Sequence, residues 1–512
     1  MNSNINKQNM IRTVLRRTFV FLLISLIFSG LSIAKPIDQN TAKQAALNFL
    51  ANEVFYTPIQ PLTLVNAVAT SVGNTAVGQV SDGYYIFGND NCFVIISADD
   101  AAKPILAYST ESGFGTNNVS PEVNYMLGLY KQQINFIQSN QVAATDEITK
   151  TWTGLINNTN AQSKTATWVK ALMTTTWDQA PYYNDLCPYD NNYQQLTVTG
   201  CVATAMAQVL KFWNYPATGS QSNSYYDNPY GDLSFAFQTT TFNWDSMPAK
   251  ITGHNSSIAT LMFACGVAVD MSYGVGATGG SGAYVIPPYN GSSSPSALIA
   301  LVHYFKYNNQ TIKGYNRSDT KDFPTDNSWR AMLQNEISNG RPVIYAGSEA
   351  SGAGHCFDFD GFNTQNGLFH VNWGWSGAYN GFFAIDSLNP SGVGIGGGTG
   401  QFNLRQQAII GILPASMSEN NHNSGIQNVS APGNLSIYPN PARNSFIADL
   451  TNFDGTPQMI NIIDIQGKQV NSVVPVSNSK MTINTSNIPD GVYVVQIISD
   501  KGITNSKIVV QK

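Results

Sequence analysis

The chain has 512 residues, of which 43% are hydrophobic and 11% aromatic, and its formal net charge is −5. A chain of this length exceeds one ordinary domain and contains enough apolar residues for several cores. Its lysines and arginines are scattered and form no basic run, so nucleic acid is excluded as an expected partner.

The first 34 residues have the pattern of a signal peptide. Four basic residues precede the apolar run "TFVFLLISLIFSGLSIA", and the small residues Ser32 and Ala34 occupy the positions that signal peptidase reads. The run of about 17 residues is short for a membrane span. We therefore expect cleavage after Ala34, an exported protein, and no membrane span once the signal is removed.

Residues 35–150 show a mixed helical and strand pattern. Apolar residues at helical spacing in "NTAKQAALNFLANEV" predict a short helix, "GYYIFGNDNCFVIISADDAAKPILAYS" predicts strands around an Asn-Asp turn, and "PEVNYMLGLYKQQINFIQ" predicts a second helix. Residues 151–167 are polar, and we interpret them as an exposed linker in which a protease could cut. The sequence thus predicts an α+β domain followed by a maturation site.

Residues 168–414 form the largest predicted unit, in which helical patterns alternate with glycine-rich and tyrosine-rich strand segments. A second polar linker, 415–433, follows it. Residues 434–512 contain short strand patterns separated by turn signals, which predict a small all-β sandwich. This last unit contains no cysteine or histidine, so attachment, sorting or binding is a more fitting role for it than catalysis.

Cys201 is the first candidate for chemistry. It follows Gly200 in "VTGCVATAMAQVLKFWNYP", and an apolar stripe at helical spacing begins directly after it. A sulfur at the start of a helix meets unpaired NH groups and the positive end of the helix dipole, which stabilise a thiolate. Gly200 would allow a sharp turn and leave space beside the sulfur for a substrate.

Cys201 could instead be a buried core residue, half of a disulfide or a metal ligand. Burial as a small apolar residue is the commonest fate of a cysteine. The five cysteines occur at irregular spacings, so no disulfide framework is expected and at least one thiol should be unpaired. The sequence contains no CxxC or HExxH pattern and no G-x-S-x-G element after a strand, which argues against a metal site and a serine hydrolase.

A nucleophilic cysteine requires a general base, most often a histidine. His355 in "SGAGHCFDFDGF" is the best candidate, because glycines open space before a strand. On that strand Phe357 and Phe359 share the face of His355, and Cys356 and Asp358 face the other way. The other histidines are less suitable. We expect His254 in an exposed turn, His303 in a helix, His370 on a partly solvated strand face and His422 in a linker.

An acyl-transfer site also requires donors that face the developing oxyanion. The backbone NH of Cys201 is suitably placed at the helix start. Several Asn and Gln side chains could supply a second donor, and spacing alone does not choose among them.

Several segments together resemble the streptopain family of papain-like cysteine peptidases: "TTTWDQAPYYN", "TGCVATAMAQVLKFWNYP", "VAVDMSYG", "GHCFDFDGF", "FHVNWGWSGAYNGFFAIDSLNP" and "GVGIGGGTGQFN". The resemblance covers roughly residues 174–414 in the expected order. It implies an α+β papain-like catalytic domain with Cys201 as nucleophile and His355 as its partner. It further implies that Gln179 donates to the oxyanion.

The same resemblance assigns roles around the cleft. Asn372 and Trp373 match the segment that packs beside and orients the histidine, and Trp375 matches the aromatic residue at the cleft edge. The family behaves largely as a Cys-His dyad. Residues 392–400 correspond to a glycine-rich loop that borders the substrate cleft, and the candidate cleft residues in it are Gly392, Gly394, Gly396, Gly397 and Gly398.

The two flanking regions also resemble known domains. Residues 35–150 are similar to the family's inhibitory propeptide domain, most closely in "NCFVIISADDAAKPILAYS". The last 80 or so residues, with "LSIYPNPARNSF", "IIDIQGKQV" and "IPDGVYVVQI", resemble the C-terminal sorting domain of the type IX secretion system of Bacteroidetes. These resemblances imply a zymogen that is exported to the cell surface or the medium by that machinery.

We therefore expect a secreted cysteine endopeptidase that hydrolyses proteins or peptides, is inhibited by its own propeptide, and uses neither cofactor nor metal. One alternative is another Cys-His acyl-transfer enzyme, a cell-wall amidase or a transglutaminase-like protein. The other is a surface adhesin that keeps the fold without activity.

Overall fold

The structure is a computed structural model, and it divides the chain into two compact units, residues 1–415 and 416–512. Among the residues it describes, no helix is long and apolar enough to cross a membrane. The described residues are 35–52, 62–65, 83–115, 119–159, 168–288, 292–319, 321–323, 325–348, 354–385, 406–417, 434–453, 457–464, 469–473, 480–499 and 502–512.

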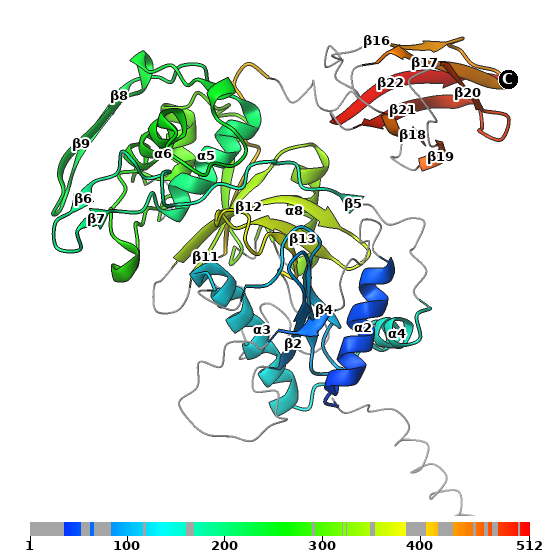
Figure 1. The fold of residues 1–512 in the computed structure, drawn as a ribbon, viewed down its shortest axis with the longest axis horizontal. Coiled ribbons are helices and arrows are strands. Elements are labelled where there is room, and N and C mark those ends of the chain that lie inside the picture. Colours follow the sequence, from blue (N-terminus) through cyan, green and yellow to red (C-terminus); the bar gives the residue numbers. More distant parts are fainter. Residues whose placement is uncertain are drawn as a thin grey trace, which may run out of the picture. The chain divides into compact units, whose positions relative to one another are not determined.

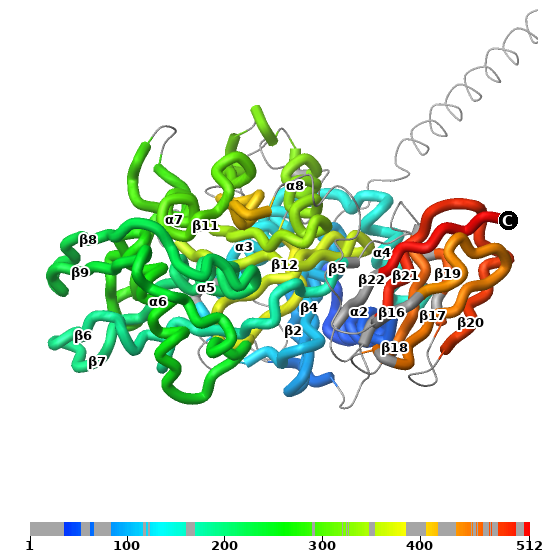
Figure 2. The backbone as a smooth tube through the Cα atoms, turned by 90° about the horizontal axis from the view of Figure 1, so that it is seen from above, coloured from blue at the N-terminus to red at the C-terminus, as the bar shows by residue number. Residues whose placement is uncertain are grey.

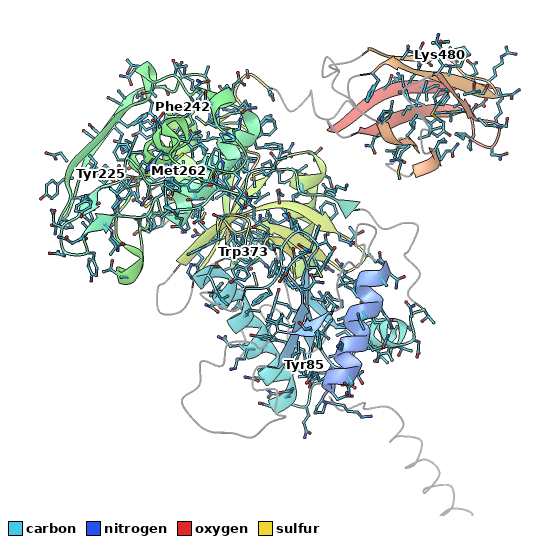
Figure 3. The ribbon with its side chains drawn as sticks, in the orientation of Figure 1. Tyr85, Tyr225, Phe242, Met262, Trp373 and Lys480 are labelled. Carbon is cyan, nitrogen blue, oxygen red and sulfur yellow. The ribbon has the colours of Figure 1, made fainter. Side chains whose placement is uncertain are left out.

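The N-terminal part of the first unit is a small antiparallel sheet with helices packed beside it (Figure 1). Its strands follow each other in chain order, and Tyr85 lies on the second of them (Figure 3). Ser120 begins the long helix α3, since its hydroxyl accepts a hydrogen bond from the NH of Val123. The elements are α2 (Gln39–Asn52), β1 (Thr63–Leu64), β2 (Tyr84–Gly88), β3 (Phe93–Ser97), β4 (Ile105–Ser109), α3 (Pro121–Ser139) and α4 (Asp146–Ile156).

Helix α4 corrects the start of the linker predicted over 151–167. The helix continues to Ile156, and Ile148, Trp152 and Leu155 form its buried face. The indole NH of Trp152 donates to the carbonyl of Ala102. The apolar residues at i, i+4 and i+7 lie among threonines and charged residues, so the short stripe is inconspicuous in the sequence. Residues 160–167 lie outside the described part of the chain.

The rest of the first unit contains the predicted Cys201 helix and a larger antiparallel sheet. Met262 and Phe242 belong to the core around α5 and α6 (Figure 3). The helices are α5 (Cys201–Trp213), α6 (Ser256–Ala268), α7 (Ala297–His303) and α8 (Asp326–Ser338). The strands are β5 (Trp168–Val169), β6 (Tyr189–Asp190), β7 (Gln195–Leu196), β8 (Ser222–Asp227), β9 (Gly231–Ala236), β10 (Lys313–Asn316), β11 (Val343–Ser348), β12 (Gly354–Asn363), β13 (Leu368–Asn372), β14 (Gly381–Phe383) and β15 (Gln407–Ile410).

One sheet runs through both parts of this unit, in the order β1-β2-β3-β4-β14-β13-β12-β11-β15-β10. The junction is the antiparallel pair of β4 and β14, in which Tyr108 lies opposite Phe382 and their rings stack at 5.0 Å between centroids. The hydroxyl of Tyr130 on α3 donates toward the carbonyls of Leu106 and Ala384, one on each side of the junction. The N-terminal part is therefore hydrogen bonded to the larger one as a continuation of its sheet.

Strand β12 separates two hydrophobic cores, as its alternating side chains predict. Phe357 and Phe359 belong to the core that continues into the N-terminal sheet. Cys356 belongs to the core around α5. The two faces of β12 therefore contact different parts of the unit, and the Cys201 helix packs on the Cys356 face.

The second unit is the predicted β-sandwich (Figure 2). It has sheets ordered β16-β17-β20 and β19-β18-β21-β22. Side chains from both sheets, such as Phe446 and Val495, share one core. The strands are β16 (Asn434–Tyr438), β17 (Ser445–Asn452), β18 (Pro457–Asp464), β19 (Gln469–Val473), β20 (Lys480–Asn484), β21 (Gly491–Ser499) and β22 (Gly502–Val510).

Candidate active site

Cys201 is the first residue of α5, at the helix start that the sequence predicts. Gly200 precedes it with φ 87° and ψ 144°, and no side chain caps the helix. A Cβ on Gly200 would lie 2.9 Å from Met271 Cε and 3.1 Å from Ser281 Cβ. Only glycine satisfies both the backbone angle and this packing. The first NH groups of α5 are thus directed at the cysteine end of the helix.

The other cysteines differ from Cys201 in their surroundings. All five lie among the described residues as thiols, and Cys201 alone is not buried. Burial raises the pKa of Cys187 to about 12 and raises the pKa of Cys265 well above its ordinary value. These two thiols therefore remain protonated at neutral pH and are poor nucleophiles.

A small cleft at the start of α5 brings together several predicted site residues. Gln179, Cys201, Asn372 and Trp373 all line it, although they come from three separate segments of the chain. Helix α5 lines the cleft with Thr204, Ala205 and Gln208. Cys356 and Phe357 at the start of β12 line it too, as does Gly374, which follows Trp373. This arrangement places an amide side chain and a thiol in the same confined space.

The segment that contains Gln179 is held by its backbone. The NH of Thr199 donates to the carbonyl of Gln179 at 3.2 Å, which ties this segment to the turn before Cys201. Ser376 Oγ donates to Asp178 Oδ2 at 2.6 Å, from the loop that follows Trp375. The backbone around Gln179 is therefore held by two other segments of the chain.

Asn372 fastens the end of β13 to α5. Its Nδ2 donates to the carbonyl of Thr175 at 2.7 Å, and its Oδ1 accepts from Gln208 Nε2 at 3.1 Å and from the NH of Gly374 at 3.2 Å. Gln208 is fully buried and its Oε1 accepts from the NH of Trp177. Asn372 thus acts on the cleft through Gln208 and the Thr175 backbone.

The two tryptophans of this segment are placed differently. Trp373 is buried, its indole NH donates to the carbonyl of Tyr379, and its ring lies 4.7 Å from that of Phe357. Trp375 is only partly buried, in the loop between β13 and β14. Trp373 therefore packs against β12 at Phe357, two residues from His355, whereas Trp375 is only partly buried.

His355 lies at the start of β12, opposite Gly347 of β11. Its ring packs against that of Tyr125 on α3, with 5.8 Å between centroids. A Cβ on Gly347 would approach the Tyr125 ring to 3.2 Å, so glycine makes room for this contact. The histidine is thus in contact with a helix of the N-terminal part. The predicted loop glycines 392–398 lie outside the described residues.

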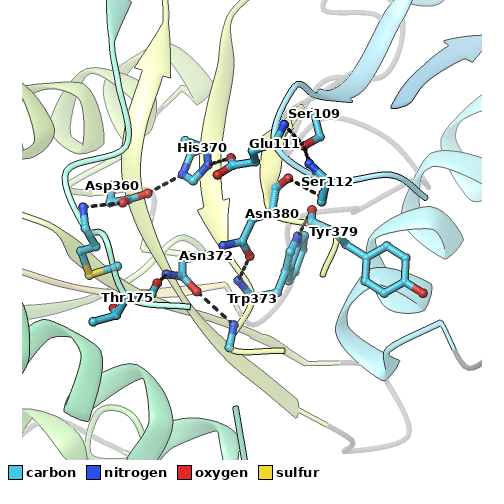
Figure 4. A network of polar contacts seen from close by, with 12 residues as sticks. Ser109, Glu111, Ser112, Thr175, Asp360, His370, Asn372, Trp373, Tyr379 and Asn380 are labelled. Carbon is cyan, nitrogen blue, oxygen red and sulfur yellow. Dashed lines mark hydrogen bonds and ion pairs between the residues drawn. The ribbon is translucent and has the colours of Figure 1, made fainter. Parts of the chain in front are cut away.

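A second polar cluster lies across the β4–β14 junction, and the sequence analysis missed it (Figure 4). His370 Nε2 is 2.6 Å from Glu111 Oε1, and His370 Nδ1 is 2.6 Å from Asp360 Oδ1. His370 is 2% exposed, so the expectation of a partly solvated face is wrong. Nearby, the rings of Phe114 and Tyr379 pack together, and the Tyr379 hydroxyl donates to the carbonyl of Gly115.

Charge explains the state of this cluster. Burial alone would lower the pKa of His370, but the adjacent carboxylates of Asp360 and Glu111 raise it to about 10. Burial also opposes ionisation of Glu111, yet its hydrogen bond with His370 lowers its pKa below the ordinary value. Asp358, on the same face as Asp360, is fully buried, and burial followed by repulsion from Asp360 raises its pKa well above the ordinary value. His370 is therefore a cation held between two carboxylates.

A helix-start cysteine in a cleft with a glutamine, packed on an antiparallel sheet whose strand β12 carries a histidine near its start, is the arrangement of a papain-like cysteine peptidase. His355 is not among the described residues that line the cleft, and its ring lies against Tyr125 instead. Comparison with known proteins agrees: residues 177–383 match the Peptidase C10 family, 34–134 match the Spi protease inhibitor, and 436–511 match a secretion system C-terminal sorting domain. The chain is 32% identical to streptopain of Streptococcus pyogenes over 428 residues, covering 77% of this chain and 98% of that one.

The chain belongs to the Peptidase C10 family, and it is a secreted cysteine peptidase made with an inhibitory propeptide. It is also similar to a thiol protease/hemagglutinin of Porphyromonas gingivalis, at 29% identity over 78% of this chain and 45% of that one. A fragment of prointerpain A from Prevotella intermedia matches with a TM-score of 0.51 and 32% identity, over 65% of this chain and 97% of the fragment. The sorting domain directs type IX export to the cell surface or the medium.

Proposed function

We propose that Cys201 and His355 are the catalytic dyad of this peptidase and that Gln179 completes its oxyanion hole. The observation that carries the proposal is the position of Cys201 at the uncapped start of α5, in a cleft that it shares with Gln179. Unpaired NH groups and the helix dipole stabilise the thiolate there. His355 is on the strand that flanks this cleft, next to the cleft residue Cys356.

The reaction follows from these positions. The Cys201 thiolate attacks the carbonyl carbon of a peptide bond, and the oxyanion accepts hydrogen bonds from Gln179 and the NH of Cys201. His355 gives a proton to the leaving amine, and it then activates the water that hydrolyses the thioester. Asn372 and Trp373 position the strand ends around the dyad. Trp375 borders the cleft, and Gly392, Gly394, Gly396, Gly397 and Gly398 belong to a loop that borders the substrate.

The test uses the precursor from Lys35 onward, incubated under reducing conditions and followed by mass spectrometry and casein cleavage. We expect the wild type to lose the N-terminal segment by cleavage after the end of α4, within residues 157–167, and to become active. Cys201→Ala should stay intact. Cys187→Ala, which removes a buried thiol of the same domain, should behave as the wild type does. Processing of Cys201→Ala when it is incubated alone would remove Cys201 from its proposed role.

Gln179 is tested in the mature enzyme. Removing one oxyanion donor costs on the order of a hundredfold in kcat. Gln179→Ala should therefore lower kcat by that factor and leave the rate of Cys201 alkylation largely unchanged. Full activity of Gln179→Ala would show that another group donates to the oxyanion.

Inhibition by the propeptide is proposed to act on the histidine. Tyr125 packs on the His355 ring, and β4 continues the catalytic sheet. As long as the Tyr125 ring of α3 contacts the His355 ring, the histidine is held by the propeptide and is kept from acting with Cys201. Tyr125→Ala should therefore give faster activation of the precursor, whereas the mature enzyme, which has lost residue 125, should have unchanged activity.

A further inference from the structure

A second groove lies next to Gln179 and takes no part in the mechanism proposed above. It has a volume of about 370 Å³, and its walls come from the segment after Gln179, from the turn before Cys201 and from the loop that contains His254. Every residue that lines it belongs to the catalytic domain. The groove is therefore formed equally in the precursor and in the mature enzyme.

The groove is continuous with the catalytic residues along the chain. Ala180, in its wall, directly follows Gln179, and Val198 lies three residues before Cys201. The hydrogen bond from the Thr199 NH to the Gln179 carbonyl joins these two walls. A peptide whose scissile bond lies at Cys201 therefore passes next to the groove, and one of its side chains can enter it.

A histidine is fixed at the edge of the groove by two neighbours. His254 Nδ1 lies 2.7 Å from Asp185 Oδ2, and the Tyr182 ring meets the His254 ring edge to face at 4.8 Å between centroids. The His254 side chain is 76% exposed, against 23% for Asp185. Because Nδ1 is engaged by the carboxylate, Nε2 is the ring nitrogen left for a ligand.

Tyr182 occupies this position at a cost in backbone conformation. Its φ is 72°, in the left-handed region that a bulky side chain seldom adopts. Such residues persist where the surrounding structure enforces them, and they are enriched at ligand sites. The strain holds an aromatic ring against His254 at the edge of the groove.

We propose that this groove is a substrate subsite that takes a tyrosine side chain of the polypeptide being cleaved. Pro181, Leu196 and Val198 give the ring apolar contact, and Tyr182 adds an aromatic one. The phenol hydroxyl both donates and accepts, so it can hydrogen bond to Nε2 of His254 in either protonation state. Asp185 disfavours an acidic side chain by repulsion.

This subsite rests on the proposed function, and the experiment separates the two. Mature wild-type enzyme is given a peptide library in which each position within four residues of the scissile bond is varied, with cleavage read by mass spectrometry. We expect tyrosine to be preferred at one position. Matched peptides with tyrosine, phenylalanine or alanine at that position then give kcat/KM for the wild type, for His254→Ala and for a control, His303→Ala, at an exposed histidine on α7.

The hydroxyl contact predicts the pattern of rates. Loss of one hydrogen bond changes kcat/KM by about fivefold to tenfold. For His254→Ala, kcat/KM should fall by that factor on the tyrosine peptide and stay at the wild-type value on the phenylalanine and alanine peptides. The control His303→Ala should match the wild type on all three peptides. Absence of a tyrosine preference in the wild type, or an equal loss on all three peptides, overturns the subsite. Cleavage of the alanine peptide by the wild type does not depend on the subsite, so it tests the proposed peptidase activity separately from the tyrosine preference.

Discussion

Glu111 of the propeptide and His370 of the catalytic domain form an ion pair across 259 residues of sequence, with 2.6 Å between Glu111 Oε1 and His370 Nε2. The same histidine contacts Asp360, whose second oxygen accepts from the NH of Met173. Removing the propeptide removes Glu111 and leaves the His370 cation with one carboxylate. The pair therefore favours the inhibited precursor over the separated domains.

The first prediction concerns the strength of this pair. A hydrogen bond to a charged group contributes about 1.5–3 kcal/mol, and the 47% exposure of the Glu111 side chain reduces this toward about 1 kcal/mol through solvent screening. Glu111→Gln should therefore release the propeptide several times faster. The measurement is the rate at which activity appears when each precursor is treated with a trace of mature enzyme. The exposed Asp90→Asn should match the wild type, and an unchanged rate in Glu111→Gln would contradict the prediction.

The second prediction is a pH dependence, which follows from the direction of each pKa shift. The pKa of Glu111 is lowered from 4.5, so its contribution is complete above that value and is lost as pH falls through the lowered pKa. The pKa of His370 is raised from 6.5 to about 10, so its contribution is complete below 6.5 and is lost as pH rises toward about 10. The pair is strongest between the two ordinary values.

We therefore expect the difference in unfolding free energy between wild-type precursor and Glu111→Gln to be largest near pH 5–6.5 and to disappear in acid. Urea unfolding at a series of pH values, with Cys201→Ala in both chains to prevent processing, measures it. The wild type and the variant differ only at residue 111, so the titrating groups that do not contact Glu111 cancel, and the difference reports Glu111 together with its partner His370. A difference that stays constant into acid would exclude Glu111 ionisation as its origin.

The sequence predicts the parts of the site that depend on local patterns. The apolar stripe after Cys201 locates the helix start, and the alternation around His355 correctly assigns Phe357 and Cys356 to opposite faces. The Glu111–His370 pair escapes this reasoning because each residue looks ordinary in its own segment, and their contact arises only when β4 joins β14. Long-range pairing of this kind is set by the tertiary fold and leaves no periodic signal.

The third prediction tests Gly200, the glycine before the proposed nucleophile Cys201. Gly200→Ala would place a Cβ at φ 87° and within 3.0 Å of Met271, so both backbone strain and overpacking oppose it. We expect a loss of about 2–4 kcal/mol in unfolding free energy and a large loss of activity. Gly231→Ala is the matched control, since Gly231 has φ 89° and no neighbour within 4 Å of the added Cβ. It should incur only the cost of the backbone angle, and equal destabilisation of the two variants would show that packing at Gly200 is unimportant.

The fourth prediction concerns the amide pair behind the cleft. Asn372→Ala removes the acceptor of Gln208 Nε2 and the donor to the Thr175 carbonyl, both in a region that excludes solvent. An unsatisfied buried polar group costs about 1–3 kcal/mol, so the variant should be destabilised by that amount. Its kcat should also fall, since Thr175 and Trp177 lead directly to Gln179 and are held through the same amides. A double-mutant cycle with Gln208→Ala should give a coupling energy of about 1 kcal/mol or more. Additive effects of the two substitutions would mean that Asn372 acts on the cleft by a route that does not pass through Gln208.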